Sequence, residues 1–249
     1  MARIDYNGPV ADAYEAGRGA PPGGLDGWRD ALAAYLPTDL PVLDLGAGTG
    51  LYSRLIHSWF GQAVIAVEPA IAMLRQSASN APNGAIRHLV GRAEQLPLAN
   101  GTIGAAWLST MIHHIDDLSA AARELRRVLA PDAFVLIRAT FPGLQSQIAL
   151  YRFFPTAARM VDTFPTVAAV AEAFGQAGFA IESQTSVTQT NAASLREFHD
   201  KLRLRANTTL MTLPDHEFAA GLEHLRQAVR DRDAADEPVV SQLELIVLR

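Results

Sequence analysis

The sequence predicts an α/β fold built on a doubly wound, mostly parallel sheet. Short apolar runs alternate with amphipathic helical patterns through the first 140 residues, and this alternation is typical of parallel strands joined by helical crossovers. The run 134–138 is apolar up to its last residue, as are strands that are covered on both faces. A glycine turn follows the first strand directly, and such a turn lets the backbone approach a bound ligand closely.

The first 140 residues carry the expected alternating unit. Residues 1–36 are expected to form an N-terminal arm or lid, because Gly and Pro are frequent up to residue 24 and a short helix over 26–36 stops at Pro37. Strands are expected at 41–45, 63–68, 85–90, 104–109 and 134–138. Helices are expected over 49–60 with Gly61 as a C-terminal cap, from Pro69 onward, and through Leu118, Ala122, Leu125 and Leu129 at helical spacing.

After the fifth expected strand the regular alternation loosens. Residues 141–165 combine prolines with many aromatic side chains. The further expected elements are a helix near 166–177, a strand near 179–187, helical patterns over 192–206 and 214–232, and an apolar strand over 243–248.

Composition excludes several classes of function. The chain has 249 residues, which suits one large α/β domain, and 49% of them are hydrophobic, enough for a sizeable core. Its formal net charge is −5 and lysine occurs once, as Lys201, so the basic face of a general nucleic-acid binder is not expected. Cysteine is absent, which excludes disulfides and thiolate metal sites. Without a leader or a long apolar run, a cytoplasmic protein with no membrane partner is expected.

Residues 42–50, V-L-D-L-G-A-G-T-G, form an apolar strand that runs into a glycine turn. The strand at 64–68 ends on the carboxylate of Glu68, which is placed to accept hydrogen bonds from both hydroxyls of a ribose. Together these features predict a site for a nucleoside-bearing cofactor. A dinucleotide fingerprint would have a third glycine five residues after Gly46, but Leu51 stands there and its side chain would crowd a pyrophosphate.

This glycine segment closely resembles the first motif of the class I S-adenosylmethionine-dependent methyltransferases. Residues 91–97, G-R-A-E-Q-L-P, resemble that family's adenine-binding turn, and residues 109–114, S-T-M-I-H-H, resemble the end of its fourth strand. Residues 125–131, L-R-R-V-L-A-P, resemble the helix that leads into its fifth strand. The resemblance covers roughly residues 40–140 in the correct order and spacing, so it is far more specific than a lone glycine motif.

The resemblance implies a Rossmann-like, seven-stranded sheet whose last strand is antiparallel and inserts beside the fifth. It implies one domain over 1–249, in which 1–36 is the arm or lid, and 141–165 with 190–235 are insertions that form a substrate cap. The implied cofactor is S-adenosyl-L-methionine. Its implied contacts are Tyr14, Arg18, Asp44, Gly46, Ala47, Gly48, Glu68, Pro69, Ala93, Glu94 and Ser109.

Three of the implied contacts have specific roles in the family. Glu68 is implied to hold the ribose, Glu94 to accept a hydrogen bond from the adenine amino group, and the backbone of Ala93 to donate to the adenine ring. Glu94 has an alternative role as an acid at a helix N-terminus, where the helix dipole favours it. Asp44 either lies near the charged end of the cofactor or stabilises the turn.

Two pairs of polar side chains also have alternative roles. Tyr14 and Arg18 share one helical face at their four-residue spacing and are implied to close over the methionine carboxylate, or else they are solvated residues of the arm. His113 and His114 stand where methyl donor and acceptor should meet, and either can act as a base or only line the pocket and support the turn. No metal site is expected, because no third ligand lies near this pair.

The predicted function is methyl transfer from S-adenosyl-L-methionine to a small-molecule metabolite. Proximity and orientation are expected to drive it, since they can lower a barrier by about 7 to 11 kcal/mol. Five arginines at 152, 159, 196, 203 and 205 favour an acceptor with a carboxylate or phosphate, although such arginines also occupy solvated helix faces. Two alternatives remain: a cofactor-binding protein with a non-methylating reaction, and a non-catalytic ligand-binding module.

Overall fold

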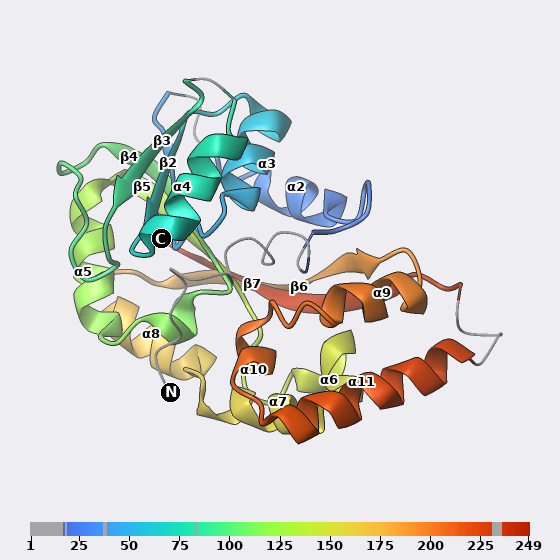
Figure 1. Ribbon diagram of the computed structural model, residues 1–249. Coiled ribbons are helices and arrows are strands. Elements are labelled where there is room, and N and C mark those ends of the chain that lie inside the picture. The colour runs from blue at the N-terminus through green and yellow to red at the C-terminus, as the bar shows by residue number, and fades with distance from the viewer. Residues whose placement is uncertain (1–16, 18, 37–38, 83, 231–235) are drawn as a thin grey trace. The chain divides into compact units, whose positions relative to one another are not determined.

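The computed structural model describes residues 17, 19–36, 39–82, 84–230 and 236–249. Its strands form one seven-stranded sheet in the order β3-β2-β1-β4-β5-β7-β6 (Figure 1). They are β1 Val42–Leu45, β2 Val64–Glu68, β3 Ile86–Val90, β4 Ile103–Ser109, β5 Leu129–Ala139, β6 Ile181–Ala192 and β7 Val239–Leu248. The pairs β1–β2, β1–β4, β2–β3 and β4–β5 are parallel, and β7 pairs antiparallel with β5. The predicted sheet and the antiparallel last strand beside strand five are therefore confirmed.

The chain divides into two compact units. The sheet unit consists of Arg29–Ala139, Pro165–Ser186 and Glu244–Arg249, and the helical unit consists of Met1–Trp28, Thr140–Phe164 and Val187–Leu243. The helices of the sheet unit are α3 Leu51–Phe60, α4 Ile71–Asn80, η1 Ile112–His114, α5 Leu118–Val128 and α8 Val167–Gly175. α2, Asp26–Leu32, spans the boundary between the two ranges.

Crossover handedness places the helices of the sheet unit on two faces. From β1 to β3 the chain moves toward one edge of the sheet through α3 and α4, whereas from β4 to β5 it moves toward the other edge through α5. Because parallel crossovers are right-handed, α3 and α4 cover one face and α5, with α8 packed on it, covers the other (Figure 1). Since both faces are covered, β4 is buried along nearly its whole length.

The fifth strand begins earlier than the sequence predicts. Leu129 belongs to the expected helix by its apolar spacing, but α5 ends at Val128 and Leu129 pairs with Ile103 as the first residue of β5. The register then shifts, so that Phe134 is the next residue of β5 to pair, and Asp132 between them has φ +63°. An apolar residue at such a boundary suits a helix and a strand equally well, and the bulge decides between them.

The helical unit contains short helices that the sequence analysis merged or left out. Residues 141–165 form η2 Gln145–Gln147, α6 Ala149–Phe153, α7 Pro155–Met160 and η3 Val161–Thr163. The helix expected over 192–206 is shorter, α9 Leu195–Leu202, and α10 Thr208–Met211 and α11 Asp215–Arg230 follow it. β6 runs to Ala192 rather than to 187, and it lies beside β7 at the edge of the sheet. Among the described residues, every helix is too short or too polar to span a bilayer.

The core of the helical unit is a cluster of buried apolar side chains from α6, α7, α9, α10 and α11. Phe154, between α6 and α7, is 2% exposed and stacks on Phe218 of α11 with ring centroids 6.0 Å apart. Gly221 of α11 lies directly against the same ring, since an added Cβ would come within 2.3 Å of two ring carbons of Phe154. The absence of a side chain at Gly221 therefore lets α11 approach Phe154 closely.

Gly221→Ala is expected to destabilise the protein although alanine is the better helix former. Alanine gains about 1 kcal/mol in a helix interior, but overpacking a filled core costs about 1 to 3 kcal/mol, and the buried Phe154 ring is held by Phe218. Urea denaturation should show a lower free energy of unfolding for this variant. The matched control is Gly175→Ala at the end of α8, where an added Cβ meets nothing within 4 Å; it should be neutral or stabilising, and equal effects of the two changes would contradict the packing argument.

Candidate cofactor site

The candidate site lies at the carboxyl ends of β1 and its neighbours. β1 is flanked by β2 and β4, and the connections from these strands run in opposite directions. Such a switch point leaves a crevice at the carboxyl edge of an α/β sheet, where ligands bind. The predicted residues 44–48, 68–69, 93–94 and 109–114 all lie on or directly after strands that end at this edge, whereas Tyr14 and Arg18 lie outside the described residues.

The turn after β1 requires glycine at two positions, because of the backbone conformation and because of a close neighbour at each. Gly46 has φ +69°, and an added Cβ would lie 3.0 Å from the side chain of Met111. Gly50 has φ +78°, and an added Cβ would lie 2.0 Å from Oγ of Ser77 in α4. Both residues therefore need the left-handed backbone region and close contact with a neighbouring element. Gly46 and Ala47 both donate backbone N–H groups to the carbonyl of Val67, at 2.8 and 3.2 Å, which anchors the turn to β2.

The carboxylate of Glu68 joins this turn to the start of the next helix. Its Oε2 accepts the N–H of Gly48 at 3.0 Å, and its Oε1 accepts the N–H of Ala70, the residue before α4, at 2.9 Å. Pro69 lies between the two acceptor contacts and has no N–H to donate. Burial raises the pKa of Glu68, and the two N–H groups partly oppose that rise. A carboxylate has about four lone-pair sites, so two acceptor positions of Glu68 remain for a ligand.

Asp44 of β1 is a second buried carboxyl group below the turn. It is 2% exposed, and its Oδ2 accepts the hydroxyl of Ser53 in α3 at 2.6 Å. Burial raises the pKa of Asp44 to about 7, the Ser53 hydroxyl opposes this rise, and the charge of Glu68 adds to it. Within the described ranges, neither Asp44 nor Glu68 forms an ion pair. The site thus holds two buried acids that a positively charged ligand would stabilise.

The turn after β3 lies next to Glu68. The N–H of Gly91 donates to the carbonyl of Glu68 at 3.4 Å, and Ala93 is buried. Oε1 of Glu94 accepts the N–H of Asp116 at 3.1 Å, and Oε2 lies 3.4 Å from Nε of Arg92. Glu94 lies in a turn, and its carboxylate is held by Arg92 and by the backbone N–H of Asp116, the residue before the N-cap of α5.

The segment after β4 carries the remaining predicted residues. Oγ of Ser109 accepts a hydrogen bond from Nη1 of Arg138, with 3.1 Å between the two atoms. His113 and His114 lie in η1, with ring centroids 4.2 Å apart; His113 is half-buried and His114 is exposed. Among the described residues, no group of three His, Cys, Asp or Glu side chains is arranged to hold a metal ion.

Two residues of this edge, Ser53 and Arg138, are not among those predicted from the sequence. Ser53, which holds Asp44, carried no signal, because a serine in the first turn of a helix is unremarkable without its partner. Arg138 of β5 is 6% exposed, and its guanidinium lies 5.2 Å from the ring centroid of Tyr52. It did carry a signal, as the one charged residue of the apolar run 134–138.

Comparisons with known proteins find methyltransferases among the similar sequences. A family model described as methyltransferase domain matches residues 43–137. Malonyl-acyl carrier protein O-methyltransferase of Laribacter hongkongensis is 30% identical over 149 residues, covering 56% of this chain and 50% of that protein. An uncharacterized methyltransferase of Mycobacterium bovis is 37% identical over 126 residues, covering 50% of this chain and 47% of that protein. The chain thus spans about half the length of the curated relatives it matches.

A solved structure extends the similarity to most of the chain at the level of fold. It is a protein of Anabaena variabilis, described as a methyltransferase from an antibiotic biosynthesis pathway, with a TM-score of 0.74 and 21% identity. The match covers 89% of this chain and 96% of that one. Residues 43–137 thus match a methyltransferase domain by sequence, and the similarity of most of the chain to the solved structure is one of fold.

Asp44 is expected to make the stability of the protein depend on pH. Its pKa of about 7 in the folded protein lies above the ordinary value of 3.8, so its contribution to stability is present below pH 4 and is lost as the pH rises toward 7. At 1.36 kcal/mol for each pKa unit, the loss is up to about 4 kcal/mol. Asp44→Asn keeps an acceptor for Ser53 but does not titrate. Urea denaturation from pH 4 to 8 should show the wild type losing stability relative to this variant, and a constant difference would contradict the assignment.

Proposed function

We propose that this protein transfers a methyl group from S-adenosyl-L-methionine to a small-molecule acceptor. The observation that carries the proposal is the carboxylate of Glu68, which is buried at the end of β2 and oriented by two backbone N–H groups. The Glu68 carboxylate has two acceptor positions that Gly48 and Ala70 do not occupy, and these match the two hydroxyls of a ribose. This fit supports a nucleoside ligand without a phosphate, because Leu51 follows the turn where a dinucleotide site has its third glycine.

The charges of the site also fit this cofactor. S-adenosyl-L-methionine carries a sulfonium and an ammonium group, and the buried acids Asp44 and Glu68 have no cationic partner among the described residues. In the proposal Glu68 holds the ribose, the backbone of Gly46, Ala47 and Gly48 lies against the ligand, and Asp44 faces its charged end. Ala93 and Glu94 recognise the adenine, Pro69 and Ser109 complete the wall, and Tyr14 and Arg18 bind the methionine carboxylate.

The cofactor supplies an activated methyl group, so the chain mainly has to hold donor and acceptor in line. Holding two reactants in a reactive geometry can contribute about 7 to 11 kcal/mol, and a dedicated base is therefore not required. His113 and His114 follow β4 on η1, next to the segment that covers Gly46. In the proposal they line the acceptor pocket.

The contacts of the arginines in the helical unit decide which of them we propose for binding an anionic acceptor. Arg205 is engaged by the carbonyls of Leu210 and Leu213, by Asp215 and by the ring of Phe218. Arg159 donates to Thr156, and Arg203 lies 3.6 Å from Asp200. Arg152 and Arg196 are exposed and form no hydrogen bond or ion pair within the described residues, and the guanidinium of Arg152 lies 5.6 Å from the centroid of the Phe153 ring. These two are the arginines we propose for a carboxylate or phosphate of the acceptor.

The decisive experiment is incubation with methyl-labelled S-adenosyl-L-methionine and a panel of metabolites. The panel should include carboxylic acids and malonyl thioesters, since one similar protein is named for malonyl-acyl carrier protein. Labelled product from a small acceptor is expected. Binding of the cofactor without transfer to any acceptor would instead support a non-methylating reaction or a binding module, and methylation of RNA or intact protein would exclude the small-molecule acceptor.

Glu68→Ala is expected to weaken binding of S-adenosylhomocysteine strongly. Each hydrogen bond to a charged group contributes about 1.5 to 3 kcal/mol, and the variant also frees the N–H groups of Gly48 and Ala70. Isothermal titration calorimetry measures the affinity, and Glu68→Gln, which keeps one acceptor oxygen, should fall between the two proteins. Glu172→Ala, an exposed acid of α8, is the control. Unchanged affinity in Glu68→Ala would remove Glu68 from the site.

Neither histidine of η1 is expected to be essential for the chemical step. General base catalysis contributes about 100-fold to 10,000-fold, so His113→Ala and His114→Ala should each lower turnover by less than about 100-fold, with cofactor affinity preserved. Single-turnover rates with the labelled cofactor provide the measurement. A larger loss in one variant, with unchanged binding of S-adenosylhomocysteine, would assign that histidine as the general base.

A further inference from the structure

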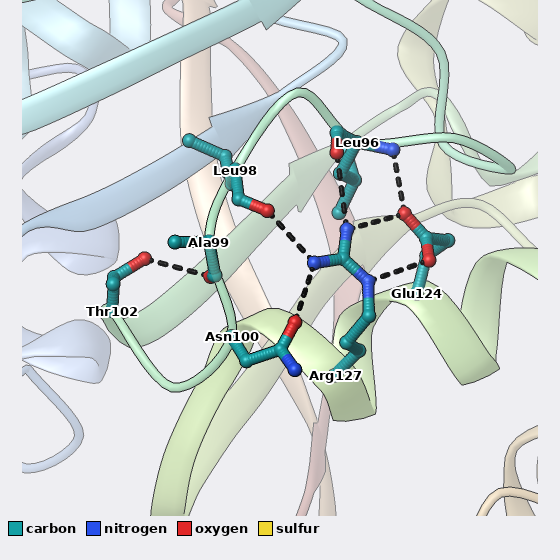
Figure 2. A network of polar contacts seen from close by, with 7 residues as sticks. All are labelled: Leu96, Leu98, Ala99, Asn100, Thr102, Glu124 and Arg127. Atoms are coloured by element: carbon teal, nitrogen blue, oxygen red, sulfur yellow. Dashed lines mark hydrogen bonds and ion pairs between the residues drawn. The ribbon is translucent and has the colours of Figure 1, made fainter.

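A fully engaged arginine holds the loop between β3 and β4. Arg127, in the last turn of α5, donates Nη1 to the carbonyl of Leu98 at 2.7 Å and to Oδ1 of Asn100 at 2.9 Å (Figure 2). Its Nη2 donates to the carbonyl of Leu96 at 3.1 Å and to Glu124 at 2.7 Å, and its Nε donates to Glu124 at 2.8 Å. These bonds match the five N–H donors of a guanidinium.

Glu124 completes the clamp from the preceding turn of α5. Its Oε2 accepts the N–H of Leu96 at 2.7 Å (Figure 2). Both the N–H and the carbonyl of Leu96 are therefore bonded to α5. The hydrogen bonds from Arg127 and Leu96 lower the pKa of Glu124, so the clamp keeps its two charges at neutral pH. We call Glu124 and Arg127 the α5 clamp.

Leu96, which the α5 clamp holds, lies two positions after Glu94. Glu94 is bonded from the other end of the same helix, because Oε1 accepts the N–H of Asp116, the residue before the N-cap Asp117 of α5. Arg92 bridges this end as well, with Nη2 2.9 Å from Oδ2 of Asp116. α5 thus holds the turn that contains Glu94 at two places, through Asp116 at its N-terminus and through the clamp in its last turns.

We propose that the α5 clamp is a positioning device for nucleobase recognition, which rests on the proposed role of Glu94 toward adenine. Peptide planarity leaves only φ and ψ free in each residue, so fixing both peptide groups of Leu96 limits the free backbone between the clamp and Glu94 to two residues and restricts where Glu94 can place its carboxylate. Loss of the clamp is expected to weaken binding of the cofactor's adenine and to reduce discrimination against a base that lacks the amino group. Arg127 and Glu124 act through Glu94 and need not touch the ligand.

The neighbouring arginine provides a matched control. Arg126 also lies in the last turn of α5, and it donates Nε to the carbonyl of Ala177 at 3.2 Å and Nη2 to the carbonyl of Gly178 at 2.7 Å. Its guanidinium lies 3.7 Å from the centroid of the Phe179 ring. Arg126→Met therefore removes comparable contacts of the same helix, but from a loop that does not contain Glu94.

The test compares two ligands on the full chain by isothermal titration calorimetry. One is S-adenosylhomocysteine, and the other is S-inosylhomocysteine, in which a carbonyl replaces the adenine amino group. Arg127→Met is expected to bind S-adenosylhomocysteine about tenfold more weakly, the size of coupling typical for residues in one hydrogen-bond network, and to lose most of the preference over S-inosylhomocysteine. Arg126→Met should keep both the affinity and the preference.

Two further variants keep the test decisive if Arg127→Met does not fold, as judged by circular dichroism and urea denaturation. Arg127→Lys retains the charge but offers fewer donors in a different geometry, and Glu124→Gln weakens the bond to Leu96; both should show the same loss in milder form. A double-mutant cycle with Glu94→Gln should be non-additive, because without Glu94 the clamp has nothing to position.

Folded clamp variants with wild-type affinity and wild-type base preference would overturn the inference, as would additive effects in the cycle. Failure of the proposed function gives a different result. The clamp depends only on cofactor binding, and if that part of the proposed function fails, the wild-type protein itself does not bind S-adenosylhomocysteine, whatever the state of the clamp.

Discussion

The carboxylate of Glu68 holds together the two backbone segments on which the site is built. One is the glycine turn after β1, through the N–H of Gly48, and the other is the start of α4, through the N–H of Ala70. A buried carboxylate needs donors to replace the water it loses, and these two N–H groups provide them. The turn and the helix start are consequently fixed with respect to each other, and the side chain that fixes them is also the one that we propose for the ribose of the cofactor.

The second constraint is electrostatic. Asp44 and Glu68 are both buried, burial raises the pKa of each, and the charge of Glu68 adds to the rise at Asp44. Ser53 reduces that cost for Asp44 with a single hydroxyl and does not remove it. A fold that keeps two poorly compensated acids below one turn is less stable near neutral pH than it would be with neutral residues, and a cationic ligand would restore the balance. Stability and ligand binding are thereby linked through the same two groups.

Three arginines act as clamps on loops. Arg126, Arg127 and Arg205 each donate to two backbone carbonyls and hold a loop that follows or precedes a helix. Arg205 does so from a left-handed backbone, with φ +50°. A guanidinium whose donors are bonded in this way is not available to bind an anion, so counting arginines in the sequence overestimates the number that can face an acceptor. Only the contacts in the folded chain distinguish the arginines that hold loops from those that can bind an anion.

The sequence by itself determined the sheet and which residues follow the carboxyl ends of its strands, because alternating apolar patterns, glycines and a carboxylate at a strand end are local signals. It could not place the start of β5 at Leu129, since apolar spacing there suits both a helix and a strand. Nor could it find the bond from Ser53 to Asp44 or the bonds from Arg127 to the loop after Glu94. Those depend on which side chains meet when segments distant along the chain pack together, and residue type alone leaves an arginine or a serine free to take many partners. The tertiary structure decided which partners these were, because close packing of α3 and α5 against the sheet leaves each of these side chains one set of donors and acceptors within reach.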